Sequence, residues 1–259
     1  HLKVSGKATD DNQDSLNVDL QDVDIEYVLS LVDFDAVSFK GQATGQAVLS
    51  GLFGDFQAGG HIIVNNFLFQ DGRMGTLDAN VNWNKELEQI DILAISNDGE
   101  DAKTYINGYV TPKRDSINLG IEARGTYLDF ARSFTSSFLD HVEGHANGAV
   151  RLIGPLDAIN LTGQLVINGN VHVTSTNCSY ELRNDTLKIV PNEIEFAHCP
   201  IYDKNGREGI LTGGIHHKNL TRLTYDIYAD TENLLAYDFK DFGDDTFYGT
   251  VYANGHVGI

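Results

Sequence analysis

Two histidines four residues apart have the spacing best suited to metal chemistry: His141 and His145, in the segment His141-Val-Glu-Gly-His145. On a helix this spacing puts both imidazoles on one face, where they could hold zinc. In an extended strand the same two positions lie about 13 Å apart. Because the surrounding residues alternate between apolar and polar as a strand does, we expect no metal at this pair.

A cluster of carboxylates at Asp241, Asp244 and Asp245 could in principle bind calcium. Its spacing differs from that of an EF-hand loop, so we interpret it as a solvated acidic loop. The Asp-Phe-Gly triplet inside it also occurs in kinases, but no glycine-rich phosphate loop or catalytic loop accompanies it. No serine, histidine and aspartate occur in the context of a hydrolase nucleophile. The sequence therefore predicts a protein that is not an enzyme and that needs no cofactor.

The two cysteines, Cys178 and Cys199, are too few for a disulfide scaffold and lack the spacing of a structural zinc site. Cys178 has the strand parity of Leu182, whereas Cys199 has the opposite parity to Phe196. In a simple meander the two thiols would lie at opposite ends of the sheet. A disulfide would need a bulge that resets the register, so we do not expect a Cys178–Cys199 bond.

The composition excludes several classes of protein. The 259 residues include 37 Asp and Glu against 18 Lys and Arg, a net charge of −19, which disfavours a nucleic-acid partner. No apolar run is long enough to span a bilayer, and no signal segment is present. The chain begins at His1, and Met74 is its one methionine, so we expect an excised piece of a longer protein whose anchor lies outside it. The 26 glycines beside only 4 prolines are typical of sheets with tight turns.

The sequence repeats with a period of about 100 residues. An apolar residue, a small polar residue and a glycine recur as Val4-Ser5-Gly6, Ile106-Asn107-Gly108 and Leu211-Thr212-Gly213. A longer block, Gly-x-Ala-x-Gly-x-x-x-Leu-x-Gly, begins at Gly41 and again at Gly144, and a partial copy begins at Gly249. We predict one continuous repeat-built segment whose units bury their apolar faces against their neighbours, with approximate bounds 4–105, 106–210 and 211–259, the last incomplete.

Within each unit, apolar residues alternate with polar ones, as in strands with one buried face. The predicted fold is all-β: an elongated, curved antiparallel sheet, or half-pipe of repeated units, with short helical insertions. These insertions are expected at Ile25–Val32, Tyr127–Leu139 and Glu232–Phe239, and in the first two the apolar residues lie at helical spacing. We interpret all three as packing elements rather than binding helices.

Many inward positions carry only glycine or alanine, which leaves two interpretations open. The small residues could mark curvature and the close approach of strands, or they could line an apolar furrow wide enough for hydrocarbon chains. On the second interpretation, the residues predicted to line the furrow are Phe39, Ala43, Gly45, Ala47, Leu49, Ile62, Val64, Val142, Ala146, Gly148, Val150, Leu152, Leu161, Leu165, Ile167, Val171, Val251 and Ala253.

These motifs resemble those of the AsmA-like superfamily, and within it most closely the translocation and assembly module (TamB) family. The resemblance covers nearly the whole chain and rests on the order of the motifs. Besides the repeated glycine blocks, it is carried by the segments Tyr180–Phe196 and Ile201–Gly206, while Leu234–Gly249 looks most like the Bacteroidetes branch.

The resemblance implies a periplasmic protein of Gram-negative bacteria, anchored in the inner membrane by a helix outside this chain. It implies a half-pipe, or β-taco, whose apolar interior carries phospholipid acyl chains between the two membranes. An alternative implied function is a scaffold for outer-membrane protein or autotransporter assembly with an Omp85-type partner. A further alternative, a structural or adhesive β-repeat, would have a closed, filled core instead of an open apolar face.

Overall fold

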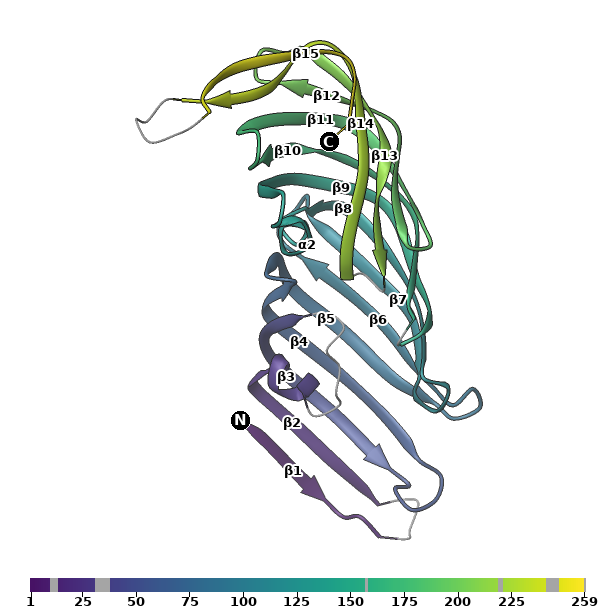
Figure 1. The fold of residues 1–259 in the computed structure, drawn as a ribbon. Coiled ribbons are helices and arrows are strands. Elements are labelled where there is room, and N and C mark those ends of the chain that lie inside the picture. Colours follow the sequence, from purple (N-terminus) through teal and green to yellow (C-terminus); the bar gives the residue numbers. More distant parts are fainter. Residues whose placement is uncertain (10–13, 31–37, 157, 219–220, 241–246, 259) are drawn as a thin grey trace. The chain divides into compact units, whose positions relative to one another are not determined.

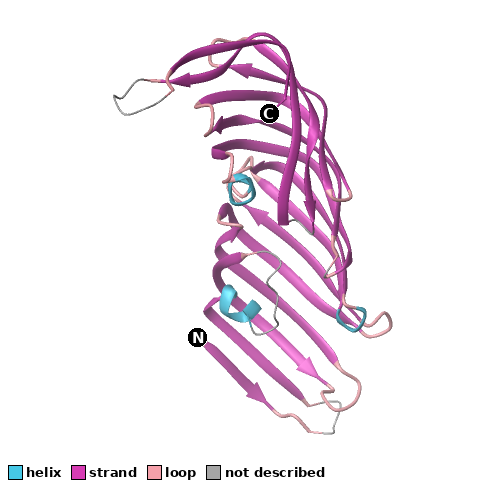
Figure 2. Ribbon diagram, viewed as in Figure 1, coloured by secondary structure: helices cyan, strands magenta, loops and turns pink. Residues whose placement is uncertain are grey.

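The computed structural model describes residues 1–259 except 10–13, 31–37, 157, 219–220, 241–246 and 259 (Figure 1). The prediction of an all-β fold is confirmed: a single open sheet of fifteen strands follows the chain order from β1 to β15, with two short α-helices and one 3₁₀ turn, all cyan in Figure 2. Every strand pair for which the register is defined is antiparallel, so the chain forms a meander of successive hairpins.

The chain divides into two compact units. Unit 1 comprises His1–Thr126 and Arg151–Ile159, and unit 2 comprises Tyr127–Val150 and Asn160–Ile259. Unit 1 is built on β1 (Leu2–Gly6), β2 (Ser15–Asp24), α1 (Ile25–Ser30), β3 (Phe39–Ser50), β4 (Gln57–Phe69), β5 (Gly72–Asn84), β6 (Gln89–Asn97), β7 (Lys103–Thr111), a 3₁₀ turn (Pro112–Arg114) and β8 (Ser116–Tyr127). Unit 2 is built on α2 (Ala131–Thr135), most of β9 (Leu139–Pro155), β10 (Asn160–Val173), β11 (Cys178–Val190), β12 (Glu193–Asp203), β13 (Glu208–Lys218), β14 (Thr221–Phe239) and β15 (Gly249–Gly258).

The repeated glycine motifs fall on strands six apart, on β1, β7 and β13. Gly108 has a φ of 144°, and a Cβ atom there would lie 2.0 Å from the carbonyl oxygen of Asn118 on β8. A side chain would therefore push the two strands apart. The equivalent Gly213 would meet the carbonyl oxygen of Asp226 at 1.9 Å. At these positions the glycine serves close strand pairing, which is the first of the two interpretations of the small residues.

Two of the three predicted helical insertions contain a helix. The segment Ile25–Val32 is helical as α1 over Ile25–Ser30, and residues 31–37 lie outside the described part. The segment Tyr127–Leu139 is helical only at its centre, as α2. The residues before α2 are bonded to the sheet instead, because Leu128 donates its backbone N–H to the carbonyl oxygen of Gly144 on β9.

The helix predicted over Glu232–Phe239 is wrong, because this segment is the second half of β14. Its backbone is engaged on two sides. Leu234 and Phe239 pair with Ala253 and Gly249 on β15, and Asp238 donates its N–H to Thr176 at 3.0 Å. Asn233, with a φ of 62°, forms part of a bulge in this strand. Pairing with neighbouring strands has overridden any local preference for a helix.

One apolar cluster in unit 1 joins β3, β4 and β5 to helix α1. Ala43, Val64, Phe67 and Met74 are buried together, and Ile25 of α1 packs against them.

Within the described part of the chain, no helix has the length and apolarity needed to cross a membrane.

Candidate functional site: the apolar face of the sheet

The strands of unit 1 align their apolar residues into two uninterrupted rows across the sheet. The first row takes one residue from each strand from β1 to β8: Leu2, Leu20, Gly45, Ile62, Ala79, Ala94, Ile106 and Ile121. The second row lies two residues away from the first on every strand, on the same side of it. It is formed by Val4, Val18, Ala47, Gly60, Val81, Ile92, Gly108 and Leu119. We call these the apolar rows. Neither contains a charged or polar side chain.

Most side chains in the apolar rows are half-buried, although Ala79 and Ala94 at the centre are only 9% and 4% exposed. Helix α1 packs against β2 and β3. Among the described residues of unit 1, no second sheet covers the rest of this face. A sheet face of this size without a covering layer leaves apolar surface accessible to a ligand.

The opposite face of unit 1 is mostly polar. A representative row on that face reads Asp19, Gln46, His61, Asn80, Leu93 and Asn107. His61 and Asp78 pair across β4 and β5 at 2.8 Å, with both side chains about half exposed. The two faces therefore differ in polarity. Consecutive residues point to opposite faces, so Ile92 lies on the apolar face and Leu93 on the polar face.

Eight of the predicted lining residues belong to unit 1. Three belong to the apolar rows: Gly45, Ala47 and Ile62. Five others are buried or half-buried on strands of this unit: Phe39, Ala43, Leu49, Val64 and Leu152. Ala43 and Val64 are only 3% and 4% exposed, so they belong to the packed cluster beneath α1 rather than to the accessible face.

The predicted lining residues in unit 2 divide by exposure. Six are half-buried: Gly148, Val150, Leu161, Leu165, Val171 and Ala253. Three are buried: Val142, Ala146 and Ile167. Val251 is 53% exposed. Ala146 is only 1% exposed, so it can offer almost no surface to a ligand.

A corner of unit 2 is closed by β14, whose second half crosses over the ends of β11 and β12 (Figure 1). Leu235 and Leu234 on this segment are 1% and 3% exposed. Tyr180 on β11 donates its hydroxyl to the carbonyl oxygen of Leu235 at 2.8 Å. Leu182 and Ile201 are buried beneath the crossing. We call this region the closed corner.

Asp203, the last residue of β12, anchors the crossing strand. Its carboxylate accepts backbone N–H groups from Asn205 at 2.8 Å, Leu235 at 2.9 Å and Arg207 at 3.0 Å. Burial alone would raise the pKa of this carboxyl, but the three N–H donors and the Arg207 charge outweigh burial and hold the pKa below its ordinary value. The carboxylate form therefore stabilises the closed corner.

Both cysteines are free, buried thiols in unit 2. The parity assigned to Cys199 from simple alternation is wrong, because a bulge between Phe196 and Cys199 resets the strand and buries both side chains. Burial, together with the neighbouring Asp185 carboxylate, raises the pKa of Cys199 to about 12. Burial also raises the pKa of Cys178 and that of Asp185. These thiols are structural groups rather than nucleophiles.

The residues suggested for metal chemistry are engaged elsewhere. His141 pairs with Glu143 at 3.2 Å, and the His145 ring lies 4.7 Å from that of Tyr127. Over the described residues, no three or more His, Cys, Asp or Glu side chains group in a way that could hold a metal ion. The cluster at Asp241–Asp245 lies outside the described residues.

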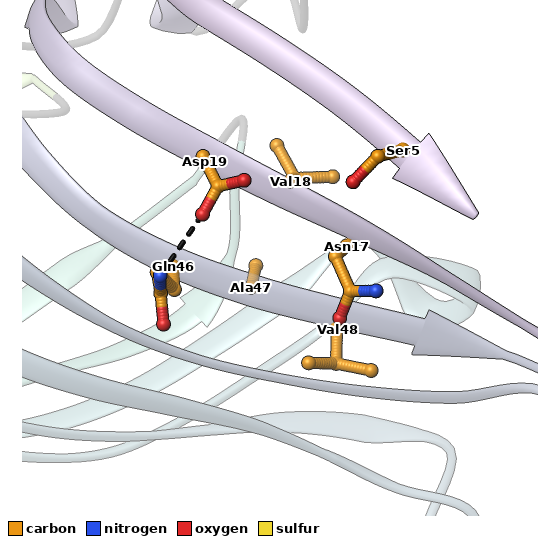
Figure 3. Close-up of a pocket in the computed structure, with 7 residues that line it drawn as sticks. All are labelled: Ser5, Asn17, Val18, Asp19, Gln46, Ala47 and Val48. Atoms are coloured by element: carbon orange, nitrogen blue, oxygen red, sulfur yellow. Dashed lines mark hydrogen bonds between the residues drawn. The ribbon is translucent and has the colours of Figure 1, made fainter.

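A surface depression on β1–β3 is also mostly polar (Figure 3). Asp19 is its one ionisable side chain, and it accepts a hydrogen bond from Gln46 at 2.9 Å. A single carboxylate bonded to an amide does not form a catalytic arrangement. The depression is lined by Ser5, Asn17, Val18, Asp19, Gln46, Ala47 and Val48.

The part of the apolar face that β5 to β8 provide, including Val81, Ile92 and Leu119, was not predicted from the sequence. On β6 the outward residues Leu93 and Ile95 are also apolar, which hides the alternation. On β8 the alternation is clear, because Ile117, Leu119 and Ile121 are separated by Asn118 and Gly120, so these positions could have been found from sequence.

No protein-family model, curated protein or solved structure matches this chain.

Proposed function

We propose that the apolar face of unit 1 binds the acyl chains of phospholipids, as one segment of a periplasmic protein that carries lipid between the inner and outer membranes. The observation that carries this proposal is the pair of apolar rows, which cross the strands from β1 to β8 without a polar side chain and without a covering sheet among the described residues of unit 1.

The energetics of acyl chains favour such a surface. Each methylene group exposed to water costs about 0.8 kcal/mol, so an apolar track lowers the cost of moving a chain across an aqueous gap. Small residues that are only half-buried, such as Ala47, Gly60 and Gly108, keep the track shallow. A shallow wall without deep pockets holds a chain weakly at each point, which suits passage better than storage.

Two neighbouring substitutions test the proposal. Ile92→Arg places a charge in the middle of the apolar rows, whereas Leu93→Arg places the same charge one residue away on the polar face, where Leu93 is 60% exposed. We expect phospholipid to copurify with the wild type and with Leu93→Arg, but at least severalfold less with Ile92→Arg, because an acyl chain lying on this face would have to displace the water around the new charge. Lipid extraction with mass spectrometry measures the amounts, and circular dichroism checks that the variants are folded. Equal lipid on both variants, or none on the wild type, would refute the proposal.

A further inference from the structure

The hairpin turns of unit 1 lie at two opposite ends of its strands, because successive hairpins of an antiparallel sheet turn at alternate ends. Residues 70–71 and 98–102 turn at one end, which we call the first rim. Residues 51–56, 85–88 and 112–115 turn at the other end, which we call the second rim. The connections from β1 to β2 and from β2 to β3 include residues outside the described part, so the rims are defined by these five turns.

Two turns of the second rim carry large apolar side chains at their tips. Phe53 is 70% exposed, and Leu87 on the neighbouring turn is 53% exposed. Turns are usually formed by small or polar residues, so two exposed apolar tips on one edge indicate a contact surface. The turns of the first rim read Gln70-Asp71 and Asp98-Gly-Glu-Asp-Ala102, and Ala102 is buried. Their exposed side chains are therefore polar.

Hydrogen bonds hold both apolar tips in place. Gly54 donates its backbone N–H to the carbonyl oxygen of Gly51 at 3.0 Å, which closes the turn that presents Phe53. Leu87 donates its N–H to the side-chain oxygen of Asn84 at 3.2 Å. Each tip is thus part of a bonded turn.

Ion pairs join the three turns of the second rim. Lys85 contacts Asp55 at 2.7 Å, which links the first two turns, and Lys113 pairs with Glu88, which links the second turn to the third. The two apolar tips therefore belong to neighbouring, linked turns, and the pairs neutralise both lysines.

The apolar face continues to the second rim. Beyond the second apolar row, the ring of Trp83 lies 5.7 Å from that of Phe56 in the first turn, in an edge-to-face arrangement. Apolar surface therefore connects the face with the turn that carries Phe53. The residues that continue the face toward this rim on β5 to β8 pair in register and are Trp83, Ile90, Val110 and Ile117.

Toward the first rim, β6 and β7 end the same face with polar side chains. The residues that follow the first apolar row on these strands are Ser96 and Thr104, which are 1% and 5% exposed. Ser96 donates its hydroxyl to the carbonyl oxygen of Met74, and the hydroxyls of Thr104 and Thr126 share a hydrogen bond at 2.7 Å. On these strands an acyl chain has an apolar path to the second rim but not to the first.

We infer that the second rim docks on the surface of a phospholipid bilayer, where Phe53 and Leu87 enter the interface and acyl chains pass onto the apolar face beside Trp83. The loading of lipid rests on the proposed function, and the inference adds where loading occurs. Apolar side chains insert at the boundary between headgroups and acyl chains, and tryptophan is enriched there. Because only two tips insert, docking is weak and reversible, which suits repeated loading.

Flotation with vesicles tests the docking contact. The vesicles consist of dioleoyl phosphatidylcholine, which has no net charge, so the net charge of −19 on the protein does not oppose docking. Phe53→Ser/Leu87→Ser removes both tips, and Leu93→Ser/Ile95→Ser removes two side chains of the polar face that are 60% and 40% exposed. We expect the tip variant to float at least about fivefold less than the wild type, and the polar-face variant to float as the wild type does. Circular dichroism checks that both variants are folded.

The fluorescence of Trp83, the one tryptophan of the chain, locates the contact. Phosphatidylcholine with bromine atoms on its acyl chains quenches a tryptophan that comes close to those chains. We expect quenching in the wild type and in Leu93→Ser/Ile95→Ser, and at least about twofold less quenching in Phe53→Ser/Leu87→Ser. A wild type that floats without quenching would place the contact elsewhere and overturn the inference.

The outcomes separate the docking contact from the proposed function. If lipid copurifies with the wild type but the protein does not float, the docking rim is wrong and the lipid-binding face stands. If both double variants lose flotation equally, exposed apolar surface in general drives binding and the inference is overturned. If the tip variant loses only self-association in sedimentation, the tips join two copies and the inference is also overturned. If no lipid copurifies but flotation depends on the tips, the proposed function and the loading step fail, and only the docking contact stands.

Discussion

The apolar face of unit 1 and the closed corner of unit 2 are built from the same alternating strand pattern, yet they end in different environments. In unit 1 each strand pairs with its neighbours in chain order, and most side chains in the apolar rows stay half-buried. In unit 2, β14 keeps its place between β13 and β15, but its second half also packs against β11 and β12 and buries Leu234 and Leu235. Alternation therefore specifies which face of a strand is apolar, but not whether that face becomes a binding surface or a core.

The largest expected difference comes from placing arginine in each region. Leu182 is 6% exposed beneath the crossing strand, so Leu182→Arg buries an unpaired charge and should unfold unit 2 or destabilise it by more than about 4 kcal/mol. Ile92→Arg should leave unit 1 folded, because the long side chain can reach water. Urea unfolding followed by circular dichroism compares the two variants. Similar destabilisation of both would mean that the apolar face of unit 1 is also a packed core.

Truncation of a large side chain sharpens the same comparison. Leu235→Ala removes a side chain that is 1% exposed, and it should lower the free energy of unfolding by about 2–5 kcal/mol. Leu119→Ala, in the second apolar row, should cost less than half as much, because Leu119 is only half-buried. The midpoints of denaturant unfolding report both values. A smaller loss for Leu235 than for Leu119 would contradict the closure of the corner.

Replacing Asp203, which anchors the crossing strand, should lower the free energy of unfolding by an intermediate amount that depends on pH. The native pKa of Asp203 is lowered, so its carboxylate contributes stability above the unfolded-state pKa near 4, and this contribution is lost as the pH falls through the native pKa. Asp203→Ala leaves three N–H donors without their acceptor and should cost about 1–3 kcal/mol at pH 7. The cost should shrink below pH 4. Unfolding measured at pH 7 and pH 3 tests this, and a cost that does not change with pH would rule out the carboxylate as the anchor.

The smallest expected change is at Asp185, where a substitution should raise the stability at pH 7 instead of lowering it. The pKa of Asp185 is raised in the native state, chiefly by burial, so its stabilising contribution is present below the unfolded-state pKa and is lost as the pH rises through the native pKa. Asp185→Asn keeps an oxygen that can accept the Arg183 N–H, which lies 2.7 Å away in the wild type. The variant should therefore be more stable at pH 7, by a few tenths to about 1 kcal/mol, and should lose this advantage near pH 3. Thermal melts at the two pH values measure the difference, and a destabilised variant at pH 7 would show that the carboxylate is needed.

Much of the strand architecture could be predicted from the sequence, because alternation and glycine spacing are local signals. The motifs at Gly6, Gly108 and Gly213 lie on strands six apart. The closed corner could not be predicted in this way. Its formation depends on a bulge near Asn233 and on contacts between residues far apart in the chain, such as Tyr180 with Leu235. The bulge before Cys199 likewise overturned an argument based on strict parity.

The candidate site was predicted only in part. Gly45, Ala47 and Ile62 were identified from their alternation and lie in the apolar rows. Ala146 was identified from the same pattern but is buried, because alternation carries no information about what packs on top of a face. The register that aligns eight strands into two rows appears only when every hairpin is in place.

The most direct test of the lipid-binding face is photocrosslinking with a phospholipid that carries a diazirine near the end of one acyl chain. After irradiation, digestion and mass spectrometry identify the residues that carry an adduct. The account predicts adducts on residues of the apolar rows between β3 and β8, such as Ile62, Ile92 and Leu119, and few on Leu93 or on Leu235 in the closed corner. Adducts spread equally over both faces of unit 1, or confined to the polar face, would contradict it.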